Sequence, residues 1–134
     1  MCATNLYLMP SLITALAVIL FMVVTKNVGG ARGRYKVQVP ATSGHPDFER
    51  YYRVQMNTLE ALVMFLPSLW LFAVYASPEG ASMLGFAWLI GRVLYARGYY
   101  IEAKKRVTGF VISILASTVL VIGGMVGIVQ QLIG

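Results

Sequence analysis

Apolar residues dominate four long stretches of the chain, and short polar segments separate them. The stretches cover residues 6–25, 55–76, 81–100 and 108–130. A helix needs about 20 mostly apolar residues to cross the hydrocarbon core of a bilayer, and each stretch is close to that length. We therefore predict one all-α integral membrane domain over residues 1–134. It is expected to be an up-down-up-down bundle with helices at about 5–25, 47–76, 81–104 and 108–131.

The composition supports a membrane protein and argues against a soluble domain. The chain has 134 residues, of which 58% are hydrophobic, and its mean hydropathy is +0.72. The net charge of +6 comes mainly from lysines and arginines between the first and second stretches and between the third and fourth. Because cytoplasmic loops carry an excess of these residues, we expect both loops in the cytoplasm and both termini on the opposite side. Such charge also suits anionic lipid, and it does not indicate nucleic acid.

The single cysteine and the single histidine offer little chemistry. Cys2 has no second cysteine with which to form an intrachain disulfide, so we interpret it as incidental. His45 has no nearby cysteine or carboxylate pair at ligand spacing, so no metal site is predicted. No lysine or arginine precedes the first apolar stretch, so we expect it to be a retained helix and not a signal peptide.

Helix breakers divide the chain between its apolar stretches. Residues 26–46 contain four glycines and two prolines and are expected to form a long connection. The second helix is expected to begin near Pro46, with Asp47 and Glu49 in its positive first turn. A tight turn at residues 77–80 makes the second and third helices an antiparallel hairpin.

Polar and ionisable residues lie at helical spacing within this hairpin. One stripe contains Glu49, Arg53, Asn57 and Glu60, and the other contains Arg92, Tyr95, Tyr99, Glu102 and Arg106 on the third helix. A rise of 1.5 Å per residue from the turn places Glu60 about 27 Å and Tyr99 about 28 Å along their helices. The stripes are therefore expected to meet near the cytoplasmic surface. Ionisable groups at membrane depth are costly and usually mark a functional site.

Two interpretations of the stripes remain open. In the first, Arg53 and Glu60 form an ion pair that stabilises helix packing, and the tyrosines form an interfacial belt. In the second, Arg53, Arg92 and Arg106 bind an anion, because they outnumber the one acid at this depth. A small zwitterion with more carboxylates than amines fits, since arginines bind carboxylates, Glu60 binds an ammonium and Asn57 bonds amide groups. Glutathione has this profile, and an adjacent cation favours its thiolate.

Two runs of residues resemble the signatures of the MAPEG family, the membrane-associated proteins in eicosanoid and glutathione metabolism. Residues 48–60 are FERYYRVQMNTLE, and residues 92–99 are RVLYARGY, with Arg106 downstream. The resemblance covers about residues 31–107 and is strongest to the branch of microsomal glutathione transferases and leukotriene synthases. It implies a homotrimer of four-helix subunits that holds glutathione between neighbouring subunits near the cytoplasmic face.

The resemblance also implies roles for individual residues. The glutathione-binding set would be Arg32, Arg53, Gln55, Asn57, Glu60, Tyr95 and Tyr99. Arg106 would also bind glutathione and would stabilise its thiolate. Gly33 stands where the leukotriene synthase branch has a second arginine, thought to donate a proton, so either Arg34 takes that role or the role is absent. Ala61 replaces an expected tyrosine and removes one contact with glutathione. These departures argue against leukotriene synthesis.

Three hypotheses for function follow. The leading one is a membrane glutathione transferase, whose thiolate beside Arg106 attacks a lipophilic electrophile from the bilayer or reduces a lipid hydroperoxide. The second is a non-catalytic lipid-binding scaffold, of which the same family contains an example, although the retained polar residues argue against it. The third is a small multidrug transporter that uses a membrane glutamate. Such carriers usually place this acid in the first helix, which here carries no charge.

Overall fold

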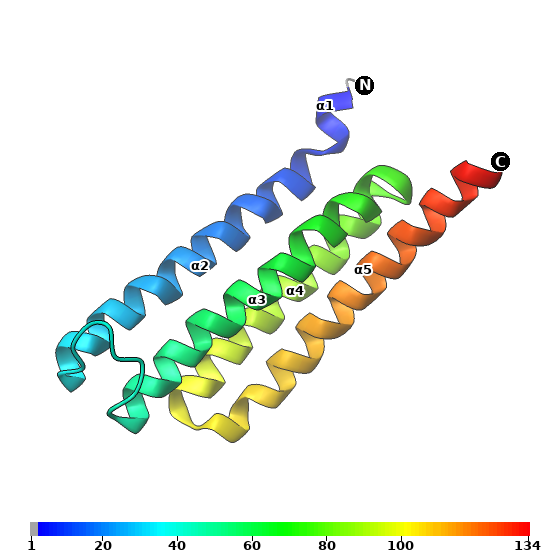
Figure 1. Cartoon of the computed structure of the whole chain (residues 1–134). Helices are drawn as coiled ribbons and strands as arrows, with labels where there is room; N and C mark the ends of the chain where they lie inside the picture. The colour runs from blue at the N-terminus through cyan, green and yellow to red at the C-terminus, as the bar shows by residue number, and fades with distance from the viewer. Residues whose placement is uncertain (1–2) are drawn as a thin grey trace.

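The chain folds into four long helices. The computed structural model describes residues 3–134, which contain no strand, and Cys2 lies outside the described residues. The helical elements are α1 (Ala3–Leu6), α2 (Leu8–Tyr35), α3 (Pro46–Tyr75), α4 (Pro78–Ile101), the 3₁₀ helix η1 (Ala103–Arg106) and α5 (Val107–Ile133). Consecutive long helices run in opposite directions, and both ends of the chain lie at the same end of the bundle (Figure 1). α2 packs on α3 and α4 from one side, and α5 packs on them from the other.

The first long helix extends ten residues beyond its predicted end. α2 continues through Gly29 and Gly30 to Tyr35, so the predicted long connection is reduced to residues 36–45. Tertiary packing explains the difference, because Val28 and Ala31 are buried in a cluster with Phe48 of α3. The burial of this apolar face outweighs the poor helix propensity of the glycines.

The start of α3 follows its predicted signal, whereas α4 starts within the segment predicted as a turn. Pro46 is the first residue of α3, and the His45 ring accepts a hydrogen bond at Nδ1 from the Asp47 backbone N–H at 3.1 Å. α4 begins at Pro78, three residues before the predicted start, because the Ser77 hydroxyl caps it by accepting a bond from the Gly80 N–H at 3.0 Å. Proline at the first helical position and a serine cap are common helix starts.

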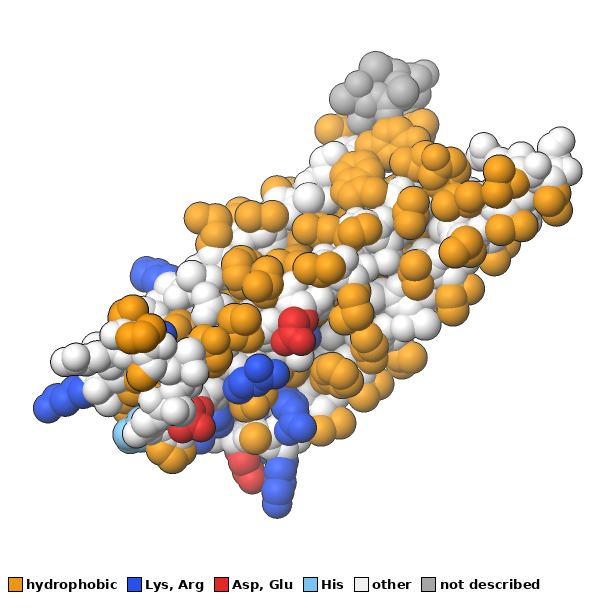
Figure 2. Space-filling model, in the orientation of Figure 1, with side chains coloured by type: hydrophobic (Ala, Val, Ile, Leu, Met, Phe, Trp, Pro, Cys, Tyr) orange, Lys and Arg blue, Asp and Glu red, His pale blue; other side chains and the backbone are white. Residues whose placement is uncertain are grey.

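Three segments are long and apolar enough to cross a membrane. They are α2, α3 and the segment Ala103–Ile133 that contains α5. The expectation of four spanning helices is thus supported for three. α4, which contains Arg92, Arg97 and three tyrosines, is not among them. Figure 2 shows hydrophobic side chains over most of the visible face, whereas charged side chains gather towards the end with the α2–α3 connection and the α4–α5 turn.

A hydrogen bond between α2 and α3 supports the packing of the first helix. The Trp70 indole N–H donates to the Thr14 hydroxyl at 3.0 Å, and the bond is partly buried. We expect Thr14→Val to lower the free energy of unfolding in detergent by about 1 kcal/mol, because the indole N–H loses its acceptor. Thr118→Val is the matched control, since the exposed Thr118 hydroxyl bonds only the carbonyl of Ile114 in its own helix. Equal effects of the two changes would contradict this role for Thr14.

Candidate functional site

An open groove lies between α3, the last turns of α4 and the start of α5. Its volume is about 330 Å³, and it is lined by Arg53, Asn57, Tyr95, Tyr99, Arg106, Val107 and Phe110. The first five of these residues belong to the set predicted from the sequence. The structure therefore brings the two polar stripes together, as their equal distances from the turn predicted.

Arg53 and Glu60 approach each other along α3. Arg53 Nη2 and Glu60 Oε1 are 4.0 Å apart, and the side chains are 52% and 61% exposed. An exposed pair of this kind contributes at most about 1 kcal/mol. The pair of the first interpretation is therefore present, and because both residues lie on α3, it does not itself join two helices. Both side chains remain accessible to a ligand.

Arg106 reaches the groove by a different route from the predicted one. α4 ends at Ile101, Glu102 is extended with φ −161° and ψ 136°, and η1 follows. The prediction that Glu102 and Arg106 continue the stripe of the third helix is therefore wrong, because the extended residue breaks the helix. The Arg106 guanidinium nevertheless lies 5.7 Å from the centre of the Tyr99 ring. The turn between α4 and α5 supplies this cation.

The two groove tyrosines contact each other, whereas Tyr100 faces elsewhere. The rings of Tyr95 and Tyr99 meet edge to face, with their centres 5.6 Å apart. Tyr100 stacks on Tyr51 with ring centres 4.3 Å apart, and its hydroxyl accepts a hydrogen bond from Asn27 of α2 at 3.1 Å. The tyrosines therefore lie on two different faces of α4.

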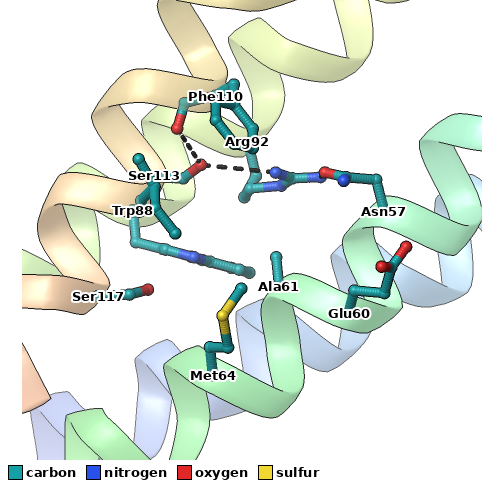
Figure 3. A pocket seen from close by; sticks show the side chains of 10 residues that line it. Asn57, Glu60, Ala61, Met64, Trp88, Arg92, Phe110, Ser113 and Ser117 are labelled. Carbon is teal, nitrogen blue, oxygen red and sulfur yellow. Dashed lines mark hydrogen bonds between the residues drawn. The ribbon is translucent and has the colours of Figure 1, made fainter.

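Arg92 lies inside the bundle and not in the groove. Its side chain is 1% exposed and borders an inner cavity of about 80 Å³ between α3, α4 and α5 (Figure 3). The expectation that three arginines share one open crevice is therefore wrong for Arg92, because neutral oxygens of neighbouring helices bind it. Arg53 and Arg106 are the two cations that line the groove.

The predicted residues on α2 do not reach the groove. The Arg32 guanidinium donates to the Ala41 carbonyl at 2.7 Å and lies 5.0 Å from the centre of the Phe48 ring. Arg34 is exposed, with Nη1 3.5 Å from the Tyr51 hydroxyl. Both arginines belong to the helical end of α2, whereas the sequence placed them in a loop.

Gln55 also faces α2. Its side-chain amide donates to the Thr25 hydroxyl at 3.2 Å. Within one subunit, the predicted site residues are therefore divided between two faces: a groove on the α4–α5 side of α3 and a second group on its α2 side.

Sequence reasoning missed the α5 side of the site. Val107 and Phe110 line the groove, and Ser113 and Ser117 line the inner cavity. The two serines are four residues apart in a mostly apolar helix, so they lie on one face. Hydroxyl groups at this spacing are the signal that could have identified this face.

A third, mostly apolar hollow of about 320 Å³ lies between α3 and α5. It shares Met64, Ile114 and Ser117 with the inner cavity, and the inner cavity in turn shares Asn57 and Phe110 with the groove. The three hollows therefore form a series along the α3–α5 contact, which begins polar at Arg106 and becomes apolar towards Val121.

Fold and groove together define a helical membrane protein with a polar groove, lined by two arginines, at one end of its bundle. The model of the MAPEG family matches residues 10–126, so the chain belongs to the MAPEG family, and the resemblance found in the sequence is confirmed.

The relatives include both characterised and uncharacterised proteins. The chain is 55% identical to an uncharacterized protein of Synechocystis sp., over 93% of this chain and 91% of the relative. It is 41% identical to microsomal glutathione S-transferase 2 of Homo sapiens, over 78% and 71% of the two chains. It is 32% identical to leukotriene C4 synthase of Bos taurus, over 89% and 79%.

Proposed function

We propose that the protein is a membrane glutathione transferase, with glutathione as its co-substrate. The observation that carries the proposal is the groove, in which the polar residues of two helices face one hollow beside Arg106. Membership of a family whose relatives include microsomal glutathione S-transferases supports the same function.

The charges of the groove suit glutathione. Arg53 and Arg106 face the hollow, and Glu60 is the acid nearest to Arg53. Glutathione carries two carboxylates and one ammonium, so it can occupy both cations and the acid while exchanging the weak Arg53–Glu60 contact for its own. Asn57, Tyr95 and Tyr99 supply further hydrogen-bonding groups.

The active molecule is proposed to be a homotrimer. Arg32, Arg34 and Gln55 lie on the α2 side of the subunit, and an adjacent copy that presents this side to the groove would complete the predicted binding set. The four helices would cross the bilayer up-down-up-down, with both termini on the non-cytoplasmic side and the site near the cytoplasmic face.

Arg106 is proposed to stabilise the thiolate of bound glutathione. The thiol proton leaves to solvent, and the guanidinium balances the negative charge on sulfur. The thiolate then forms a carbon–sulfur bond to an electrophile, and the leaving group takes the electron pair of the bond that breaks. With a lipid hydroperoxide, one thiolate attacks the peroxide oxygen, and a second glutathione completes a disulfide while the alcohol and water form.

A lipophilic second substrate would enter from the bilayer. The apolar hollow between α3 and α5 opens beside the inner cavity and contains Val63, Leu71 and Val121. An apolar chain in this hollow would place its reactive end towards the groove, since the hollows follow one another along the same helix contact.

The direct test uses purified protein in detergent or liposomes. We expect it to bind glutathione in calorimetry and to conjugate it to a chloronitrobenzene or reduce a fatty-acid hydroperoxide. Absence of any heat of glutathione binding would defeat the proposal and would favour the lipid-binding scaffold.

Arg34 is proposed to supply the second catalytic cation, because position 33, where the leukotriene synthase branch has an arginine, is a glycine in this chain. We expect Arg34→Ala to lower kcat by about tenfold or more while KM for glutathione changes little, because a proton donor acts mainly in the chemical step. Lys36→Ala is the control, since Lys36 is a neighbouring cation that caps α2. Unchanged kcat in the Arg34 variant would mean that the second cationic role is absent from this enzyme.

A further inference from the structure

Arg92 is the only buried charged side chain among residues 5–134, and the proposed reaction does not use it. The side chain is 1% exposed. The ion pairs within the described part of the chain are Arg50 with Asp47 and Arg53 with Glu60. Arg92 therefore forms no ion pair with an acid among these residues. A buried cation without an acid is costly in a membrane protein, and such residues usually have a function.

Neutral groups from three helices surround the Arg92 guanidinium. Nη2 donates to Asn57 Oδ1 at 3.1 Å and to Thr58 Oγ1 at 3.0 Å, both on α3. Nη1 lies 3.5 Å from Ser113 Oγ on α5, and the guanidinium carbon is 4.0 Å from the centre of the Tyr95 ring. Nε has no partner. Figure 3 shows the end of the guanidinium meeting the Asn57 side chain above the inner cavity. Arg92 therefore contacts two residues that line the groove, Asn57 and Tyr95.

These contacts determine which end of the Asn57 amide is free. A guanidinium carries only donors, so the carboxamide must turn its oxygen towards Arg92. Its NH₂ group is then left without this partner. Asn57 borders both the inner cavity and the outer groove, so the NH₂ group can donate into the groove.

We propose that Arg92 is a positioning residue, which holds Asn57 with its NH₂ group towards the groove so that a carboxylate or carbonyl oxygen of the ligand is bound there. This inference rests on the proposed function and deepens it. It places a hydrogen-bond acceptor of the ligand, a carboxylate or carbonyl oxygen, beside Asn57, and it places the ligand's ammonium beside Glu60. Arg92 touches no ligand atom and acts through Asn57 and, by ring contact, Tyr95.

The test is a double-mutant cycle on glutathione affinity, measured by calorimetry with Arg92→Lys, Asn57→Ala and the double variant. Lysine keeps the charge but cannot reach the oxygens of Asn57, Thr58 and Ser113 together. We expect each single change to weaken binding about tenfold, and the double variant to bind within about twofold of Asn57→Ala. We also expect kcat of Arg92→Lys at saturating glutathione to stay within about twofold of the wild type, since positioning for binding mainly raises KM.

Ser113→Ala is the matched control. It removes a partner of Arg92 on α5 and leaves the bond to Asn57 intact, so glutathione affinity should stay within about twofold of the wild type. The positioning role would be overturned if Arg92→Lys bound glutathione as tightly as the wild type. It would also be overturned if the loss of affinity in the double variant equalled the product of the two single losses. If the wild type itself binds no glutathione, the proposed function fails. This outcome differs from the two that overturn only the positioning role, because in both of those the wild type binds glutathione.

Asn57→Asp provides a second test of the proposal, which can be used if Arg92→Lys does not fold. Aspartate keeps the shape of asparagine and still accepts from Arg92, but it presents an acceptor to the groove where asparagine presents a donor. We expect the variant to melt at a temperature no lower than that of the wild type and to bind glutathione at least tenfold more weakly. Wild-type affinity in this variant would show that the groove needs no donor at this position.

Discussion

Replacing Arg106 with alanine is expected to lower kcat/KM for glutathione conjugation by roughly 100- to 1,000-fold. The proposed reaction depends on the thiolate, and Arg106 and Arg53 are the two cations that line the groove. Arg106 is also the one that extends from the α4–α5 turn to lie over Tyr99. Its removal leaves the negative sulfur without its adjacent charge, so we expect the loss to be largest for kcat. Steady-state assays at saturating glutathione separate this effect from weaker binding.

Two further variants sharpen the test of Arg106. Arg106→Lys retains the charge and should recover part of the activity, to within about tenfold of the wild type. Lys105→Ala removes the adjacent exposed cation, which does not line the groove, and should leave the kinetics unchanged. Full activity in Arg106→Ala would disprove the assigned role, whereas equal losses in the two alanine variants would reduce it to a general effect of surface charge.

Replacing Gly109 with alanine is expected to lower the free energy of unfolding in detergent by about 3 kcal/mol. A Cβ at this position would overlap the backbone nitrogen of Tyr95 and the carbonyl oxygen of Gly91. Backbone atoms of two helices cannot yield as a flexible side chain can, so α4 and α5 would have to separate. Because Tyr95 lines the groove, glutathione affinity should fall as well. Thermal unfolding and calorimetry on the same preparation measure both effects.

Gly30→Ala is the control for Gly109→Ala. It makes the same chemical change within a helix, but a Cβ at Gly30 would meet nothing within 4 Å. Alanine has the higher helix propensity, so we expect this variant to be more stable by roughly 0.5–1 kcal/mol. If Gly109→Ala were equally well tolerated, the close approach of α4 and α5 could not be a requirement of the fold.

Local sequence signals predicted most of the fold. Proline at position 46 marked the start of α3, because a fixed φ angle and a cap act within one turn. Residues 77–80 were predicted as a turn, whereas Ser77 caps α4 and Pro78 begins it, so this start was placed three residues too late. The end of α2 was not predictable in this way. Gly29 and Gly30 indicate a break, whereas the burial of Val28 and Ala31 against Phe48 of α3, distant in the sequence, favours a continuous helix.

The candidate site was predicted to a similar degree. A regular rise per residue placed Glu60 and Tyr99 at one depth. Tyr99 lines the groove, and Glu60 lines the adjoining inner cavity. The burial of Arg92 could not be predicted. Its spacing equals that of the groove residues, but a few degrees of rotation about the helix axis decide whether a side chain at the edge of a stripe faces solvent or a neighbouring helix.

The sequence by itself determined that the chain is a helical membrane protein of the MAPEG family and that Arg53 and Asn57 share one helix face. Hydropathy, helical period and family signatures depend only on residue order, so they can be read before folding is known. The tertiary structure alone decided that Arg92 is enclosed by Asn57, Thr58 and Ser113, and that Arg106 approaches from a turn. Those outcomes depend on contacts between residues far apart in the chain, whose packing sets the burial of each charge.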